Sequence, residues 1–165
     1  MSLDVNTLQT HLKYTDWASG RLVEAASILK PEELSKDFGT ADRSVLGTLV
    51  HLYAANRVWL SRVKGEVPGP YIVPERDMHL SVLQSDWPPL RQAWLQWTSG
   101  LTNDSLNDRI SYRDLKGQPH QTPIWQIILH LVNHDTHHRG QVSGFLRALG
   151  HTPPVLDLIA YYRSH

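Results

Sequence analysis

A regular stripe of apolar residues between positions 122 and 150 constrains the fold of this chain more than any other feature. Its positions recur at steps of three or four residues, which is the spacing of one face of an α-helix. Six are apolar and two are histidines: Ile124, Ile127, Leu131, His134, His138, Val142, Phe145 and Leu149. We expect Thr122 to cap this helix, Pro123 to occupy its first position and Gly150 to mark its end. The sequence therefore predicts one long helix with two histidines on its buried face.

Three further segments show a helical period. The first predicted helix covers residues 8–29, the second begins at Ser44 as its N-cap and stops near Gly65, and the third begins near Trp87. Apolar residues nearly encircle the second helix, which indicates that it is buried on several sides.

Shorter signals complete the pattern. Residues 67–74 are rich in proline and glycine and predict a loop, whereas residues 109–121 predict a short extended pair around Lys116-Gly117. The sequence thus predicts an all-α fold: an up-and-down four-helix bundle with a short extended pair before the fourth helix and a short C-terminal helix. We expect a single domain over residues 1–165, because the length suits one core and no repeat or linker is evident.

Composition excludes several classes of function. Sixteen basic residues balance sixteen acidic ones, and no basic stripe interleaved with aromatic residues is present, so we expect no nucleic-acid partner. No apolar run approaches the roughly 20 residues of a membrane span, and the N-terminus lacks a signal-peptide pattern, so we expect a cytoplasmic protein without a membrane partner. The chain has no cysteine, which excludes thiolate ligands and a cysteine nucleophile.

Histidines concentrate in residues 130–141, a segment that holds four of the ten in the chain. His134 and His138 lie four residues apart on the stripe, so their rings can converge on one ion. The alternative is a pair of buried neutral rings that hydrogen-bond to their neighbours, since burying a polar ring without a partner costs free energy. A metal held by protein nitrogens usually needs a third ligand, and His51 in the second helix is the best candidate.

The other histidines fit structural or surface roles better. His130 sits at the edge of the apolar face, His137 points away from His138, and His11 is the weaker candidate for a ligand. An outer imidazole or Asn133 could orient a ligand through a hydrogen bond, whereas Asp135 is rotated away from His134 and is not an obvious ligand. Four more histidines are expected in loops or tails and in contact with solvent: His79, His120, His151 and His165.

These residues belong to segments that resemble the DinB-like, damage-inducible superfamily over nearly the whole chain. The resemblance rests on YTDWASGRLVEAASILKPEEL, on SVLGTLVHLYAANRVWLSRVKG, and above all on ILHLVNHDTHHRGQVSGFLRALGHTPPVLDLIAY. It implies a four-helix bundle with a metal held by three histidines, which map to His51, His134 and His138. Members of the superfamily commonly carry nickel or zinc, and many form dimers, so the resemblance also implies a homodimer.

The resemblance and the ligand chemistry leave three functions open. The first is a metal-dependent transferase that activates a low-molecular-weight thiol toward a small-molecule substrate; the thiol comes from outside, because the chain has no cysteine. The second is a metal-dependent hydrolase that uses a bound hydroxide, although no carboxylate stands out as its general base. The third is a non-enzymatic stress-response module in which the metal is structural. Arg57, Arg139 and the tryptophans could line a substrate pocket, but a structural role is the simpler expectation for each. We expect Arg139 to pair with a carboxylate and Trp94 and Trp97 to lie in the core.

Overall fold

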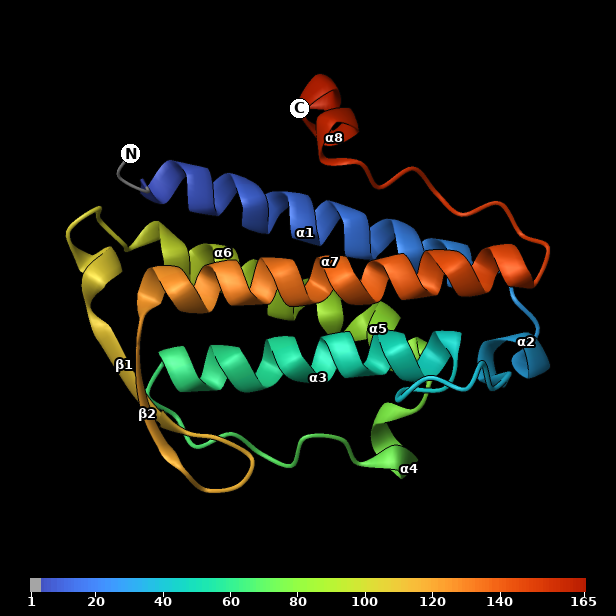
Figure 1. The fold of residues 1–165 in the computed structure, drawn as a ribbon, viewed down its shortest axis with the longest axis horizontal. Helices are drawn as coiled ribbons and strands as arrows, with labels where there is room; N and C mark the ends of the chain where they lie inside the picture. The colour runs from blue at the N-terminus through green and yellow to red at the C-terminus, as the bar shows by residue number, and fades with distance from the viewer. Residues whose placement is uncertain (1–3) are drawn as a thin grey trace.

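The computed structural model describes residues 4–165 and shows a bundle of four long helices (Figure 1). These are α1 (Val5–Ala26), α3 (Val45–Val63), α6 (Trp87–Ser99) and α7 (Ile124–Ala148). α7 packs between α1 and α3, and α6 contacts the same two helices. α1 and α7 run in one direction along the bundle, and α3 and α6 run in the other (Figure 1). The predicted bundle of four long helices is confirmed, but their directions do not alternate as in an up-and-down bundle, because the consecutive helices α3 and α6 run parallel.

Short helices occupy the connections and the C-terminus: α2 (Pro31–Ser35), α4 (Pro74–Asp77), α5 (Leu80–Ser85), the 3-10 helix η1 (Ser105–Asn107) and α8 (Leu158–Ser164). The connection between α3 and α6 is long enough to carry the chain back along the bundle through α4 and α5 (Figure 1). For this reason α6 runs parallel to α3. α8 confirms the predicted C-terminal helix, and no helix within residues 4–165 is long and apolar enough to cross a membrane.

The predicted extended pair is an antiparallel hairpin. β1 (Arg109–Arg113) pairs with β2 (Pro119–Pro123), and Gly117 in the turn has a φ of 80°, a conformation that favours glycine. The predicted cap of the fourth helix is wrong by one residue. Thr122 pairs with Ile110 in the hairpin, so Pro123 becomes the N-cap and α7 begins at Ile124.

The ends of the first two long helices follow local side-chain chemistry. Ser44 caps α3 as predicted, because its hydroxyl accepts a hydrogen bond from the backbone N–H of Gly47 at 3.0 Å. α1 ends at Ala26, three residues earlier than predicted. The apolar period continues to Leu29 because this side chain, although it follows the helix, is buried in the same core.

Two apolar clusters fill opposite ends of the bundle. Buried residues of the first cluster include Leu22, Leu49, Leu52, Trp87, Val142 and Leu146, and those of the second include Leu8, Leu12, Leu60, Trp94, Ile127 and Leu131. Between them, α3 and α7 carry a layer of polar side chains that includes buried Asn56 and Asp135. The histidines of the predicted site belong to this layer, so the two apolar clusters hold their helices on both sides.

Candidate metal centre

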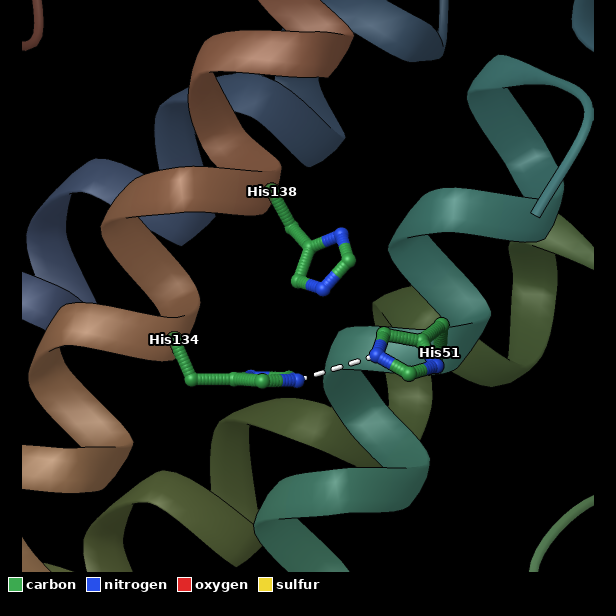
Figure 2. Close-up of side chains that lie close together, drawn as sticks. All are labelled: His51, His134 and His138. Atoms are coloured by element: carbon green, nitrogen blue, oxygen red, sulfur yellow. Dashed lines mark hydrogen bonds between the residues drawn. The ribbon is translucent and has the colours of Figure 1, made fainter. Parts of the chain in front are cut away.

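Three histidines from two antiparallel helices meet in the polar layer (Figure 2). His51 projects from α3, and His134 and His138 project from consecutive turns of α7. Their ring centroids form a near-equilateral triangle, with separations of 5.0 Å for His51–His134, 4.4 Å for His51–His138 and 4.6 Å for His134–His138. The three residues that the sequence singled out are therefore brought together.

The spacing of their nitrogens fits a single cation. One ring nitrogen of each residue lies within 4.8 Å of the other two, and the Nε2 atoms of His51 and His134 are 3.0 Å apart (Figure 2). Two imidazole nitrogens that bind one ion at about 2.0–2.1 Å stand about 3 Å apart when their bonds are near a right angle. This group of three histidines could hold a metal ion.

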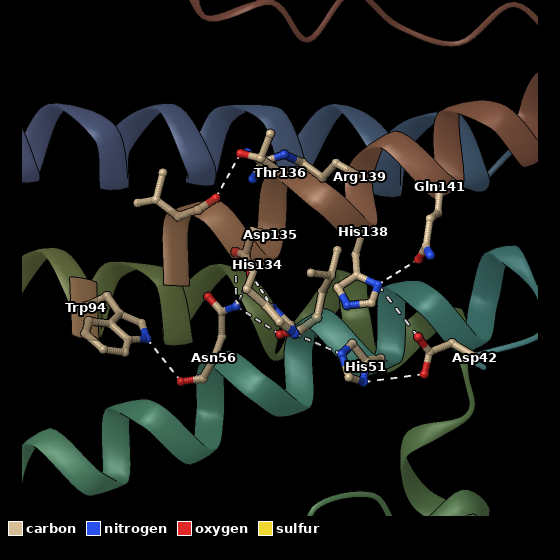
Figure 3. Close-up of polar contacts among 12 residues, drawn as sticks. Asp42, His51, Asn56, Trp94, His134, Asp135, Thr136, His138, Arg139 and Gln141 are labelled. Carbon is tan, nitrogen blue, oxygen red and sulfur yellow. Dashed lines mark hydrogen bonds and ion pairs between the residues drawn. The ribbon is translucent and has the colours of Figure 1, made fainter. Parts of the chain in front are cut away.

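The outer nitrogens of the two histidines on α7 contact side chains of the same helix. His138 Nδ1 lies 2.7 Å from Oε1 of Gln141, one helical turn further on (Figure 3). His134 Nδ1 lies 3.4 Å from Oδ1 of the fully buried Asp135. An acceptor at Nδ1 favours the tautomer that leaves Nε2 unprotonated and able to bind a metal.

A chain of hydrogen bonds ties His134 to the core of the bundle. Asn56 Nδ2 on α3 contacts both carboxylate oxygens of Asp135, at 3.2 and 3.1 Å, and Trp94 Nε1 on α6 donates to the backbone oxygen of Asn56 at 3.1 Å (Figure 3). Three helices of the bundle therefore meet in one network. Because its members are buried and bonded to one another, the network restricts the position of His134.

His51 is held from the loop that follows α3. The hydroxyl of Tyr71 lies 3.1 Å from Nδ1 of His51 and 3.4 Å from its backbone oxygen. Arg57 positions this loop, because Nη2 donates to the backbone oxygens of Pro70 and Tyr71 at 2.9 and 2.8 Å. Burial raises the pKa of Tyr71 to about 12, with a smaller contribution from the negative charge of Asp42, so the phenol stays neutral and able to donate.

Burial also lowers the pKa of two of the candidate ligands. Loss of solvation is the largest cause for both His51 and His138, and the neighbouring imidazoles lower the pKa of each further. Asp42 opposes the shift at His51, and the hydrogen bond with Gln141 opposes it at His138. Both rings are therefore favoured in the neutral form that binds a metal.

These pKa shifts predict that the metal-free protein loses stability in mild acid. In the folded state His51 and His138 have pKa values below the usual 6.5, so the unfolded chain takes up protons first as the pH falls. The free energy of unfolding should be highest above pH 6.5 and should decrease as the pH falls from about 6.5 to the folded-state pKa values, by at most about 1.4 kcal/mol per pH unit for each group, and the decrease should level off below them. Urea unfolding at pH 7.5, 6.5 and 5.5 measures the decrease. The variant His51→Gln should show a shallower dependence, and a stability that rises on acidification would contradict the prediction.

The remaining histidines lie outside the group of three. The ring of His130 packs 5.7 Å from that of His134 and 5.3 Å from Trp59, and exposed His137 lies edge-on 5.0 Å from His138. His11 contacts the backbone oxygen of Thr7 on its own helix. Of the four histidines expected in solvent, His79, His120 and His165 are exposed, whereas His151 is half-buried against Glu33 at 3.1 Å.

Arg139 and two tryptophans have structural positions. Arg139 is buried, donates to Thr136 Oγ1 at 2.9 Å and lies over the ring of Tyr14, rather than pairing with a carboxylate of the described residues. Trp94 is buried as expected, and Trp97 is half-buried with its ring edge-on to that of Trp94.

Sequence reasoning missed most of the side chains that contact the outer nitrogens. Gln141 could have been found, since it lies three residues after His138 and helical residues at that spacing are neighbours. Asp135 was expected to be rotated away from His134, but its Oδ1 lies 3.4 Å from His134 Nδ1. Asn133, which the sequence suggested for such a role, is exposed. The contacts of Tyr71 and Asp42 were also missed. Both residues lie in loops, and helical periodicity does not predict where a loop runs.

Comparisons with known proteins show the family to which this chain belongs. The sequence of Protein DinB of Bacillus subtilis (strain 168) is 18% identical over 154 residues, which cover 90% of each chain. A solved structure of a DinB-like protein from Bacillus cereus ATCC 10987 has a TM-score of 0.69 at 20% identity and covers 94% of this chain and 99% of that chain. A DinB family member from Shewanella denitrificans has a TM-score of 0.51 at 14% identity and covers 88% and 83%. The sequence model of the DinB family matches residues 1–165, and the chain therefore belongs to the DinB family.

Proposed function

We propose that this protein is a metal-dependent transferase in which His51, His134 and His138 hold a divalent ion, nickel or zinc, and a low-molecular-weight thiol is the cosubstrate. The observation that carries the proposal is the convergence of three imidazoles that remain open to solvent. Their side chains are 20%, 19% and 14% exposed. Three protein ligands with access to solvent are typical of a catalytic site, whereas structural sites are usually closed by four.

The ligand set suits the activation of a nucleophile. Neutral imidazoles add no negative charge of their own, so they leave the charge of a bound cation available to a substrate. Such an ion would lower the pKa of a thiol or water molecule that binds it. The chain has no cysteine, so any thiol must come from a second molecule.

The chain's own residues would orient the reactants. The ring of His130 lies beside that of His134 and packs on Trp59, so these two rings offer an aromatic wall to the apolar part of a small-molecule substrate. The neutral hydroxyl of Tyr71 can donate a hydrogen bond near His51. From the family resemblance we also expect a homodimer, and from the balanced charge and the lack of a long apolar run we expect a cytoplasmic protein with neither nucleic acid nor membrane as a partner.

The proposal is tested by assaying the metal-loaded protein for conjugation of a small thiol to a panel of electrophiles. We expect thiol-dependent product formation that is at least about 100-fold slower in His138→Ala, since even the outer partners of metal ligands contribute factors of about 10–100. The matched control is His137→Ala, because this adjacent histidine is exposed and outside the site. Turnover that persists after all small thiols are removed would favour metal-dependent hydrolysis instead. If metal raises the melting temperature but no small ligand reaches the ion, the metal has a structural role and the proposal is wrong.

A further inference from the structure

The loop between α2 and α3 places one carboxylate against two of the three histidines. Asp42 Oδ1 lies 3.4 Å from Nδ1 of His51, and Oδ2 lies 3.7 Å from Nδ1 of His138 (Figure 3). Each oxygen of the carboxylate thus faces a different ring, one on α3 and one on α7. Both contacts are to Nδ1, the nitrogen on the far side of each ring from the meeting point of the three histidines, so Asp42 is placed to orient the rings.

A glycine and an uncommon backbone angle restrict the conformation of the backbone around Asp42. A Cβ atom at Gly47 would lie 2.1 Å from the backbone oxygen of Asp42, so glycine at position 47 allows the loop to lie against α3. Arg43 has a φ of 63°, which is uncommon for a residue other than glycine. Strained backbone of this kind persists where the surrounding structure enforces it, and it clusters at functional sites.

Contacts on both helices enforce this conformation. Phe38 stacks on Phe145 of α7 with a centroid separation of 4.4 Å, and its backbone N–H donates to the oxygen of Arg43 at 2.7 Å. The loop is therefore anchored to α7 through Phe38 and lies against α3 at Gly47. Asp42 is supported by the same two helices that carry the histidines.

A carboxylate resolves an ambiguity that the other contacts leave. The hydroxyl of Tyr71 can either donate to Nδ1 of His51 or accept from it, so this contact alone selects neither tautomer. An ionised carboxylate only accepts, and it favours the tautomer with the proton on Nδ1. The Nε2 lone pair is then free to face the other two rings. The carboxylate also adds a negative charge beside three ligands that have none.

We infer that Asp42 is a positioning residue of the metal centre: it holds His51 in the Nδ1-protonated tautomer and adds its charge beside His138, whose Nδ1 hydrogen-bonds to Gln141, so that Nε2 of both rings is directed at a shared cation. This inference rests on the proposed metal site, but its first consequence is visible without a metal. The matched pair of variants is Asp42→Asn, which keeps the size and removes the charge, and Asp37→Asn, which changes an exposed residue of the same loop. Asn at position 37 can still accept the hydrogen bond that Gly39 donates.

The first measurement is the tautomer of the histidine rings in the metal-free protein, read from ¹⁵N chemical shifts at pH 8. In the wild-type protein and in Asp37→Asn we expect His51 and His138 to be mainly protonated on Nδ1. In Asp42→Asn the amide can donate to Nδ1, so we expect the population of Nε2-protonated His51 to increase. A wild-type His51 that is mainly protonated on Nε2, or a tautomer that does not respond to Asp42→Asn, would overturn the inference.

The second measurement is the affinity for Zn²⁺ and Ni²⁺ in competition with a chelator. We expect Asp42→Asn to bind roughly 10- to 100-fold more weakly than wild type, the usual effect of removing an outer partner of a ligand, and Asp37→Asn to bind within about 2-fold of it. Gly47→Ala gives an independent check, since its Cβ displaces Asp42 without changing the carboxylate and should also weaken binding. Equal affinity in wild type and Asp42→Asn would refute the role of Asp42 and leave the metal site intact. If the tautomers are as expected but the protein binds neither Zn²⁺ nor Ni²⁺, the result would support the positioning role of Asp42 and refute the proposed function.

Discussion

Alanine at position 51, 134 or 138 is expected to reduce bound metal from about one ion per chain to a trace. Each substitution removes one of three converging nitrogens and leaves two, whose rings are held 4.4–5.0 Å apart in the intact site. Loss of a direct ligand should exceed the roughly 10- to 100-fold effect that is typical for an outer partner. Elemental analysis of untagged protein, after incubation with nickel or zinc and removal of excess ion, measures the stoichiometry.

The control for these variants is His137→Ala, which removes an exposed imidazole next to His138 and should keep the full metal content. A thermodynamic readout accompanies the stoichiometry. Metal at 100 times its dissociation constant should stabilise the wild-type protein by about 2.7 kcal/mol, and it should have little effect on the three ligand variants. Full stoichiometric metal in all three variants would refute the assignment of the ligands.

Trp87→Ala is expected to cost about 3–5 kcal/mol of unfolding free energy, the usual range for truncating a large buried aromatic side chain. Trp87 is completely buried at the start of α6 and belongs to the first apolar cluster. Its ring lies edge-on to Tyr53 at 6.3 Å, and the guanidinium of Arg91 lies over it at 5.3 Å. The substitution removes these contacts and leaves a cavity that the surrounding helices can only partly fill.

Urea unfolding of the metal-free protein measures this cost. Trp97→Ala is the matched control, and its smaller expected loss follows from the half-buried position of Trp97. Because Trp87 belongs to the apolar cluster rather than to the group of three histidines, the folded fraction of Trp87→Ala should retain metal. The two classes of variant therefore separate stability from metal binding. A loss below about 1 kcal/mol would show that the first cluster repacks around the missing ring.

Helical periodicity was sufficient to predict the four long helices and the two candidate ligands on α7. His134 and His138 interrupt an apolar stripe at a spacing of four, which requires their rings to share a face. His51 could be paired with them only by elimination, since periodicity shows which face of a helix is buried but not which residues it meets. The ends of the elements were predicted less well: Thr122 entered the hairpin instead of capping α7, because its strand pairing extends up to the helix.

The sequence by itself determined the helices, the two histidines on the inward face of α7 and the residue types able to bind a metal, because each of these depends on spacing along one segment. Only the tertiary structure decided which oxygen faces each outer nitrogen. Asp42 and Tyr71 reach the histidines from loops, and Asn56 reaches Asp135 from another helix. Such contacts depend on loop paths and helix packing, including the close approach at Gly47 and the stacking of Phe38 on Phe145, which have no periodic signature in the chain.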